Sequence, residues 1–355
     1  MAGEPGESIH LIFCQSFIEW AAHHRAALFY FLPAQSPFLY FAKKSMAFFI
    51  QHLQQNGFDV IELTDDEGAS VQVIPALGAL LHAFTIPHKN GTLNVIDSYA
   101  SRAEYDAGVV SSFKSVKLSP FACRIKDAAY EWNGVKRQVQ KSPIHGLLYD
   151  QAFAVILEET GSQDAVVDLE YHYSGWDPGY PFPYTCNVRY RLLAQNTLEI
   201  TTSILNHHSE SIPLMDGWHP YFSTGTPVDE LELEFRSKEI VEFDDKLIPT
   251  GKLLPYTSFN QAKSLRGVEL DNSFIVDFDQ PSPLCILRDP KKHVSIEFYP
   301  STAYPILQIY IPPHRNSIAV ENLTGAPNAF NNGLGLVKLA AGESVQFATT
   351  LRVRG

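Results

Sequence analysis

The sequence predicts an all-β fold, a large antiparallel β-sandwich with a broad concave sheet and few short helices. Apolar residues alternate with period two in many short segments, and Pro, Gly, Asn and Asp punctuate the gaps between these segments. Helical periodicity is limited to about residues 39–55. Many short strands at turn-signalled spacing favour a sandwich rather than a doubly wound α/β fold.

Two hairpins are the best-defined strand pairs. Residues 58–63 alternate, an acidic turn containing Gly68 follows, and residues 71–74 alternate again. A second pair is predicted over residues 188–192 and 198–204, joined by a turn at residues 195–196. Further strands are expected at residues 231–235, 285–287, 294–298, 306–310, 318–320 and 345–352.

The first 45 residues differ from the rest, and we expect them to form an appendage to a single domain spanning residues 46–355. Met46 directly precedes a strand-like stretch, which makes it the expected start of the domain. Two interpretations of residues 1–45 stay open: upstream sequence that is not part of the native protein, or an ordinary terminal helix packed on the domain. No internal repeat or linker to a second domain is evident.

Composition excludes several classes of partner. The 355 residues include 27 basic and 39 acidic side chains, giving a net charge of -12, and no basic run is present that could bind nucleic acid. The apolar stretch near the N-terminus is broken by Pro33 and Pro37, so no membrane-spanning segment of about 18 apolar residues is predicted. An acidic start does not fit a secretory signal.

The four cysteines are scattered and show no CxxC spacing. This usage fits a reduced cytoplasmic protein better than a disulfide framework or a zinc site. No GxGxxG or Walker loop is evident, so no nucleotide cofactor is predicted, and the cysteine spacing likewise predicts no metal site.

Residues 216–222, with the sequence Asp-Gly-Trp-His-Pro-Tyr-Phe, contain the most informative candidate. His219 lies near Gly217, which permits close backbone approach, and next to Pro220, which fixes φ and lacks a donor. An imidazole held on such an irregular edge can present a proton to a ligand. The alternative is a buried histidine satisfied by its neighbours.

Four more segments concentrate polar chemistry. Arg124 lies in an apolar stretch, where a buried guanidinium needs acceptors from a ligand or from a structural ion pair. His145 precedes a glycine at a turn and can point into a cleft. Asp271 belongs either to a solvated turn or to a site for sugar hydroxyls. Glu321 ends an apolar strand, where burial would raise its pKa towards that of a general base.

These segments, in this order, resemble those of the aldose 1-epimerase (galactose mutarotase-like) family. The resemblance runs from about Gly57 to the C-terminus. It rests on the block at residues 217–222, on Glu321 followed by Ala-Pro-Asn-Ala-Phe-Asn at 326–331, and on residues 339–344. It implies the supersandwich fold of that family, with the site on the concave face.

The resemblance also implies roles for individual residues. His219 is expected to be the general acid and Glu321 the general base of mutarotation, the interconversion of α and β hemiacetals of a free aldohexose. Glu321 would take the proton of the anomeric O1 hydroxyl while His219 protonates the ring oxygen O5. Whether carboxylates raise the pKa of His219 or burial lowers it stays open at this point.

The same resemblance assigns sugar binding to Arg124, His145 and Asp271, with a further contact from Gln308. The chain departs from many members at Cys123, where they have asparagine. Monosaccharide is the expected ligand, and the expected assembly is a monomer or weak dimer.

Two other functions are consistent with the sequence. A hexose-6-phosphate 1-epimerase would need basic residues at the rim of the cleft, for which the candidates are Lys114, Lys117, Lys136, Arg137 and Arg315. A non-catalytic sugar-binding or sensing protein would not need both His219 and Glu321.

Overall fold

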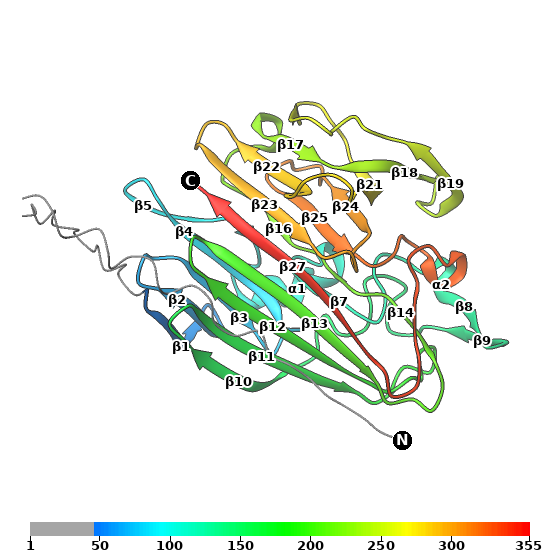
Figure 1. The fold of residues 1–355 in the computed structure, drawn as a ribbon. Coiled ribbons are helices and arrows are strands. Elements are labelled where there is room, and N and C mark those ends of the chain that lie inside the picture. The colour runs from blue at the N-terminus through cyan, green and yellow to red at the C-terminus, as the bar shows by residue number, and fades with distance from the viewer. Residues whose placement is uncertain (1–45) are drawn as a thin grey trace, which may run out of the picture. The chain divides into compact units, whose positions relative to one another are not determined.

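A computed structural model of the chain describes residues 46–355, and Figure 1 shows their arrangement. The hypothesis about residues 1–45 lies outside the described residues. The helical periodicity at about residues 39–55 does not give a helix in its described part: β1 (Phe48–Gln55) is a strand paired antiparallel with β2 (Phe58–Asp65), in line with the strand-like stretch noted after Met46. Pairing with a neighbouring strand has overridden the weak helical pattern there.

A five-stranded antiparallel sheet contains the first hairpin that the sequence predicts. Its strands follow chain order: β1, β2, β3 (Ser70–Ile74), β4 (Leu80–His88) and β5 (Gly91–Asn94).

A nine-stranded sheet contains the second predicted hairpin and forms one layer of the sandwich (Figure 1). Its order is β10 (Ala154–Thr160), β11 (Asp164–Tyr173), β12 (Tyr184–Leu193), β13 (Thr197–Asn206), β27 (Ser344–Arg354), β23 (Val294–Pro300), β22 (Cys285–Asp289), β17 (Glu232–Phe235) and β20 (Lys263–Ser264). Strands far apart in sequence, such as β13 and β27, are neighbours in this sheet.

The second nine-stranded sheet carries the candidate site. Its main path is β19 (Pro249–Pro255), β18 (Ser237–Phe243), β21 (Asp271–Val276), β24 (Ile306–Tyr310), β25 (Ile318–Leu323), β15 (Gly217–Trp218) and β7 (Lys117–Leu118). The short strand β16 (Tyr221–Phe222) pairs with β25 and with β6 (Ile96–Asp97).

Small elements complete the described domain. Two hairpin-sized sheets pair β14 (Ile212–Leu214) with β26 (Val337–Leu339), and β8 (Ala129–Trp132) with β9 (Val135–Gln138). The helices are α1 (Arg102–Ser112), α2 (Ala329–Asn332) and two single 3₁₀ turns at Lys126–Ala128 and Val228–Glu230. This architecture confirms the predicted all-β antiparallel sandwich with few short helices.

Aromatic side chains fill the space between the two nine-stranded sheets. Phe222 on β16 meets Phe298 on β23 with ring centroids 5.0 Å apart, and Phe235 on β17 meets Phe274 on β21 at 4.6 Å. Such pairs bury large areas and fix the sheets against each other. The site-bearing sheet therefore packs on a layer of aromatic side chains.

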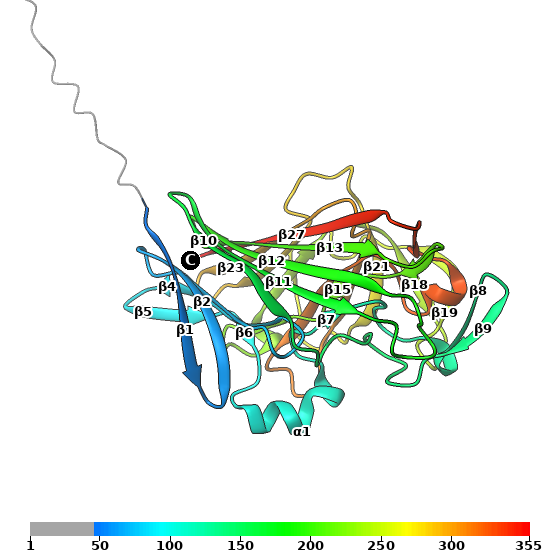
Figure 2. The same ribbon diagram turned by 90° about the horizontal axis from the view of Figure 1, so that it is seen from below.

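Helix α1 was not predicted, although the sequence contains a signal for it. The Ser101 side chain accepts a hydrogen bond from the Glu104 amide, and the Glu104 carboxylate accepts one from the Ala100 amide. This reciprocal arrangement is close to a capping box, whose signature is Ser-x-x-Glu. The helix lies at the lower edge of the domain in Figure 2.

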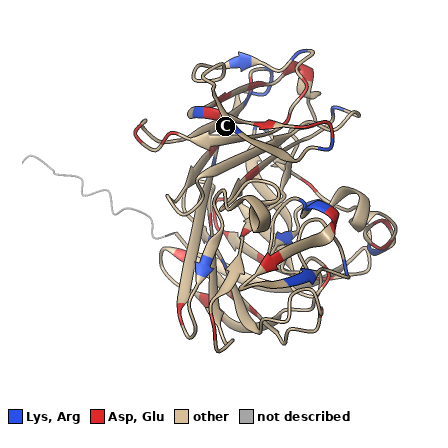
Figure 3. Ribbon diagram, turned by 90° about the vertical axis from the view of Figure 1, so that its right-hand side faces the viewer, with Lys and Arg blue, Asp and Glu red and all other residues tan. Residues whose placement is uncertain are grey.

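Charged residues of both signs are interspersed along the described ribbon (Figure 3). No helix within residues 46–355 is long and apolar enough to cross a membrane. Three of the four cysteines lie in this part of the chain, and Cys123, Cys186 and Cys285 are buried free thiols.

Candidate active site

Strand pairing brings three of the predicted residues to one face of the sheet. Gln308 on β24 lies directly opposite Glu321 on β25, and Asp271 on β21 lies opposite Tyr310, two residues beyond Gln308. Paired residues share a face, and so do residues two apart on a strand. Asp271, Gln308 and Glu321 therefore form a row across three neighbouring strands, which we call the sheet half of the site.

The remaining predicted residues lie on irregular backbone, which we call the loop half. His219 lies between β15 and β16, and hydrogen bonds to residues 115 and 116 hold its backbone on both sides. The Ser115 amide donates to the His219 carbonyl at 2.9 Å, and the His219 amide donates to the Val116 carbonyl at 3.2 Å. Pro220, next along the chain, has no amide donor, and β16 begins directly after it.

Arg124 and His145 reach the site through an isolated antiparallel bridge between Arg124 and Ile144. The His145 amide donates to the Cys123 carbonyl at 2.8 Å, and both residues adopt positive φ, 61° and 52°. Positive φ is uncommon for residues other than glycine, and here it turns both side chains towards the sheet half. Gly146 is required at the same turn, since its φ is 78° and a Cβ would lie 2.3 Å from the Ser119 carbonyl oxygen.

Asn328 holds the backbone that directly follows Arg124 with two hydrogen bonds. Its amide donates to the Arg124 carbonyl at 2.7 Å, and its side-chain oxygen accepts from the Lys126 amide at 3.0 Å. Asn328 itself adopts the left-handed conformation, with φ of 61°. The Ala-Pro-Asn-Ala-Phe segment singled out in the sequence thus positions the arginine.

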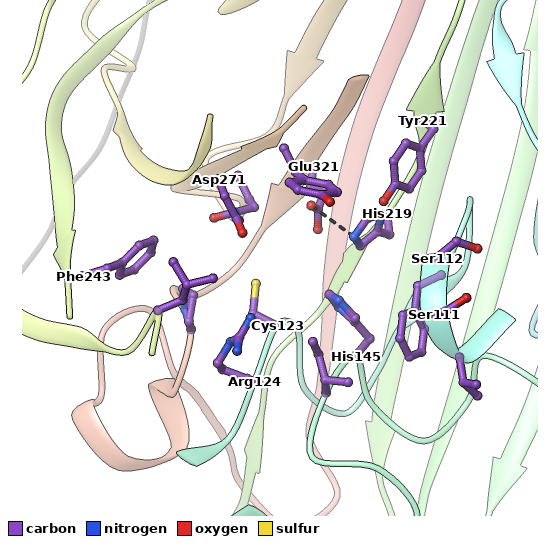
Figure 4. Close-up of a pocket in the computed structure, with 17 residues that line it drawn as sticks. Ser111, Ser112, Cys123, Arg124, His145, His219, Tyr221, Phe243, Asp271 and Glu321 are labelled. Atoms are coloured by element: carbon purple, nitrogen blue, oxygen red, sulfur yellow. Dashed lines mark hydrogen bonds and ion pairs between the residues drawn. The ribbon is translucent and has the colours of Figure 1, made fainter. Parts of the chain in front are cut away.

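The two halves enclose one cavity of about 330 Å³ (Figure 4). All six predicted site residues line it: Arg124, His145, His219, Asp271, Gln308 and Glu321. Cys123, noted in the sequence as a departure from many family members, also lines it, and so do residues that were not site candidates, which include Ser111, Ser112, Phe113, Phe243, Leu247, Tyr221 and Tyr310. The last two could have been found, because Tyr221 follows His219 by two positions and Tyr310 follows Gln308 by two.

His219 and Glu321 face each other at the buried end of this cavity. Their Nε2 and Oε1 atoms are 3.5 Å apart, the contact drawn as a dashed line in Figure 4. The His219 ring stacks on Tyr221 with centroids 5.0 Å apart, and His145 meets it edge-on at 4.8 Å. These contacts fix the plane of the imidazole.

Several polar atoms in the cavity are available to a ligand. Glu321 Oε2, His219 Nδ1 and His145 Nδ1 are buried and have no hydrogen-bond partner among the described residues. A buried polar atom without a partner costs free energy, which a bound hydroxyl group would recover. No group of three or more His, Cys, Asp or Glu within residues 46–355 has the arrangement of a metal site.

Burial shifts the proton affinities of this pair in opposite directions. Burial raises the pKa of Glu321 well above its ordinary value of 4.5, and the nearby charge of Asp271 raises it further. Burial lowers the pKa of His219 to about 4, although its own backbone partly opposes the shift. The question that the sequence left open is thus resolved in favour of burial, because desolvation disfavours the charged form of each group.

Asp271 and Gln308 form a hydrogen-bonded set beside the pair. Gln308 Nε2 donates to Asp271 Oδ1 at 2.9 Å, and the Ser273 hydroxyl donates to Gln308 Oε1, which fixes the orientation of the amide. Burial raises the pKa of Asp271, while Arg124 and Gln308 oppose this shift. The solvated-turn interpretation of Asp271 is therefore wrong.

Arg124 differs from its sequence-based interpretation as a buried guanidinium. The residue is half-buried, and its Nη1 donates to the Lys246 carbonyl oxygen at 3.5 Å. Its charge lies at the mouth of the cavity, near Cys123 in Figure 4. The buried thiol of Cys123 has a pKa well above its ordinary value because of burial.

Comparison with known proteins identifies the family of this chain. The family model described as aldose 1-epimerase matches residues 59–352, nearly all of the described domain. This chain belongs to the aldose 1-epimerase family. Among relatives, an uncharacterized Escherichia coli protein, YihR, is 26% identical over 64% of this chain and 74% of its own. A maltose epimerase of Levilactobacillus brevis is 24% identical over 70% of this chain and 78% of its own.

Solved structures of the aldose 1-epimerase family share the fold. A galactose mutarotase-like protein from Clostridium acetobutylicum superposes with a TM-score of 0.77 at 16% identity, covering 87% of this chain and 99% of its own. A galactose 1-epimerase from Lactobacillus acidophilus gives a TM-score of 0.71 at 19% identity, covering 87% and 98%. Membership of the family makes this chain an isomerase-type carbohydrate epimerase.

Proposed function

We propose that this chain is a mutarotase that interconverts the α and β anomers of a free aldohexose. The observation that carries the proposal is the 3.5 Å separation of His219 Nε2 and Glu321 Oε1 at the buried end of one cavity. A proton donor and a proton acceptor so placed can reach the two oxygens bonded to the anomeric carbon of one pyranose.

The reaction needs one proton to leave O1 and another to reach O5. Glu321 takes the O1 proton as His219 donates to O5, and the C1–O5 bond opens to give the free aldehyde. Rotation about C1–C2 presents the other face of the carbonyl. Return of both protons closes the ring as the second anomer, so the protein ends in its starting protonation state.

The pKa shifts supply the pair with one proton over a wide pH range. Above about pH 4 His219 is neutral, and below its raised pKa Glu321 is protonated. The pair with a protonated Glu321 and a neutral His219 has the same total charge as the catalytic form with a Glu321 carboxylate and a His219 imidazolium. The two forms differ only by the transfer of one proton from Glu321 to His219. Sugar hydroxyls hydrogen-bonded to the buried atoms would favour the charged arrangement.

We assign substrate binding to the rest of the site. Arg124 and His145 lie where they can donate to sugar oxygens, while Asp271 and Gln308 offer acceptor and donor atoms to neighbouring hydroxyls. Charge on the carbonyl oxygen of the open form would be stabilised by these donors.

The cavity gives less support to a hexose-6-phosphate substrate. Arg124 is the one cationic residue among its described lining residues. Three of the rim candidates from the sequence are engaged elsewhere: Lys114 with Asp97, Lys117 with Asp216 and Arg315 with Asp229. A phosphate group usually binds several cations or amide groups, so a neutral sugar fits this lining better.

Polarimetry of freshly dissolved sugars tests the proposal. We expect wild-type protein to accelerate the decay of optical rotation of α-glucose or α-galactose, with Glu321→Gln and His219→Asn as inactive controls. Maltose, the substrate named for one relative, belongs in the same panel. Acceleration of glucose 6-phosphate alone would establish the phosphate alternative. Sugar binding without any acceleration would establish the sensing alternative and overturn the proposal.

A further inference from the structure

A fully buried ion pair lies behind the candidate site, on the other face of the sheet. Lys117 Nζ is 2.5 Å from Asp216 Oδ1, and neither side chain is exposed. Lys117 on β7 pairs directly with Trp218 on β15, so both side chains share a face. The Trp218 ring lies 5.0 Å from the ammonium group and packs against Tyr190 of the other large sheet. His219, next along the chain, lines the cavity instead.

Asp216 connects the chain segments that lead to the sheet half. Its carboxylate accepts a hydrogen bond from the Tyr304 hydroxyl at 2.6 Å, just before β24 and Gln308. Its backbone is bound twice to Thr324, just after Glu321: the Asp216 amide donates to the Thr324 hydroxyl, and the Thr324 amide donates to the Asp216 carbonyl, each at 3.0 Å.

Lys117 connects the same carboxylate to the loop half. Its ammonium group also donates to the Gly217 carbonyl at 3.0 Å, two residues before His219. The two residues that precede Lys117 are Ser115 and Val116, whose backbone groups hold the His219 backbone on both sides. One ion pair is thus tied to the segments that carry the proposed acid, the proposed base and Gln308.

Core packing alone does not account for this ion pair. Removing two charges from water costs several kcal/mol, and apolar residues of similar volume are often neutral or stabilising at such sites. Hydrogen bonds to a charged group are directional, however, and can fix the register of the strands that share it. We propose that Lys117 and Asp216 are positioning residues that set the separation and orientation of His219 and Glu321.

This inference rests on the proposed function, and a double substitution tests it. Lys117→Met with Asp216→Val removes both charges without leaving one unpaired. We expect the variant to fold but to lose about 10- to 100-fold in kcat, because small misplacement of catalytic groups has effects of this size. KM should change by less than about threefold, since the sugar-binding side chains lie on the other face.

A second, partly exposed ion pair away from the cavity provides a control. Arg189 and Asp168 form a bidentate contact of 2.6–2.7 Å on β12 and β11, and neither residue lines the cavity. Arg189→Met with Asp168→Val should alter the melting temperature but leave kcat unchanged. Equal kcat losses in both double variants would indicate general destabilisation and overturn the proposal.

Tyr304→Phe keeps the test decisive if the double variant does not fold. It removes one hydroxyl group that donates to Asp216 while leaving the ion pair in place. We expect a kcat loss of about two- to tenfold at unchanged KM and an altered width of the pH profile of kcat. Wild-type kcat in a folded variant of either kind overturns the positioning role. Absence of mutarotation in the wild type would instead refute the proposed function.

A crystal structure of the double variant provides a readout that needs no activity. We expect the separation of His219 Nε2 and Glu321 Oε1 to depart from 3.5 Å, or the imidazole to leave its stack on Tyr221. An unchanged pair geometry in that structure would overturn the proposal.

Discussion

The two halves of the site are held by different physical means. On the sheet half, antiparallel pairing fixes Glu321 opposite Gln308 and sets Asp271 one strand away. The side chains of the loop half are positioned by positive φ at Cys123 and His145 and by backbone hydrogen bonds to His219. Register repeats at a fixed spacing, whereas each loop residue needs its own set of contacts.

This difference explains how the cavity can hold widely spaced groups on its strands and also one close contact between His219 and Glu321. A flat row of strand residues offers groups about one strand spacing apart, roughly 4.8 Å. Such a row cannot by itself bring an imidazole into contact with the carboxylate of Glu321. The loop half supplies that imidazole from above the row, which brings His219 Nε2 to 3.5 Å from Glu321.

The largest expected effect comes from replacing either Glu321, from the sheet half, or His219, from the loop half. Glu321→Gln and His219→Asn should each lower kcat by about 10²- to 10⁴-fold, the usual contribution of general acid–base catalysis. Because the two groups act together in the same ring-opening step, removing both should lower kcat little more than the worse single substitution does. Polarimetric kcat values for the three variants check this.

Additive losses in the double variant would mean that the two halves act independently. Glu297→Gln is a suitable control for the carboxylate, since Glu297 is a buried glutamate on β23 paired with Arg354. Its kcat should equal that of the wild type.

Gly146→Ala attacks the loop half without changing any cavity-lining side chain. The added Cβ would lie 2.3 Å from the Ser119 carbonyl oxygen, and φ at this position is 78°. We expect a loss of about 2–4 kcal/mol in the free energy of unfolding, from overpacking and backbone strain together. A shift of His145 should also lower kcat/KM by about tenfold.

Gly134→Ala is the matched control, because Gly134 has a similar φ of 75° but open space where its Cβ would lie. It should lose about 1 kcal/mol from backbone strain alone and keep full activity. Equal losses of stability at the two glycines would show that the loop half is not tightly packed at residue 146.

The same contrast decides how much the sequence could predict. Period-two alternation at residues 306–310 and 318–320 predicted β24 and β25, but alternation does not say which strands are neighbours. Pairing between strands distant in the chain, such as β13 with β27, depends on the packing of the whole domain. The fold class was therefore predictable from local pattern, and the sheet order was not.

For the loop half, the sequence alone gave weaker signals. His145 was a candidate because it precedes a glycine at a turn, and Arg124 because it lies in an apolar stretch. Their sugar-binding roles came from the family resemblance. Nothing in the local sequence indicates that Asn328, some 200 positions later, fixes the Arg124 backbone. The burial that lowers the pKa of His219 is also a property of the tertiary structure.

A smaller effect concerns the loss of folding stability that the buried carboxyl of Glu321 causes at high pH. The pKa of Glu321 is raised in the folded protein, so its stabilising contribution is complete below the ordinary value of 4.5 and is lost as the pH rises through the folded value. Glutamine does not ionise and avoids this loss. Glu321→Gln should therefore melt about 2–4 °C above the wild type near pH 8, for a gain of about 1 kcal/mol.

That difference should shrink as the pH falls towards about 5, because the carboxyl of the unfolded chain then approaches its ordinary pKa of 4.5 and also takes up a proton. Thermal melts of both proteins across this pH range provide the measurement. A wild type that stays more stable than Glu321→Gln at every pH would contradict the burial-driven shift.

Asp271→Asn should give the smallest effect and tests whether charge couples neighbouring strands of the sheet half. The negative charge of Asp271 is the second cause, after burial, of the raised pKa of Glu321. Without it Glu321 ionises more easily, so the basic limb of the kcat profile should move to lower pH by less than about one unit. The acid limb, set by His219 near pH 4, should stay in place. Asp277→Asn, beyond the end of the same strand and paired with Lys238, should move neither limb. A basic limb that stays fixed in Asp271→Asn would show that burial alone sets the proton affinity of Glu321, and that the row of strand residues shares geometry but not charge.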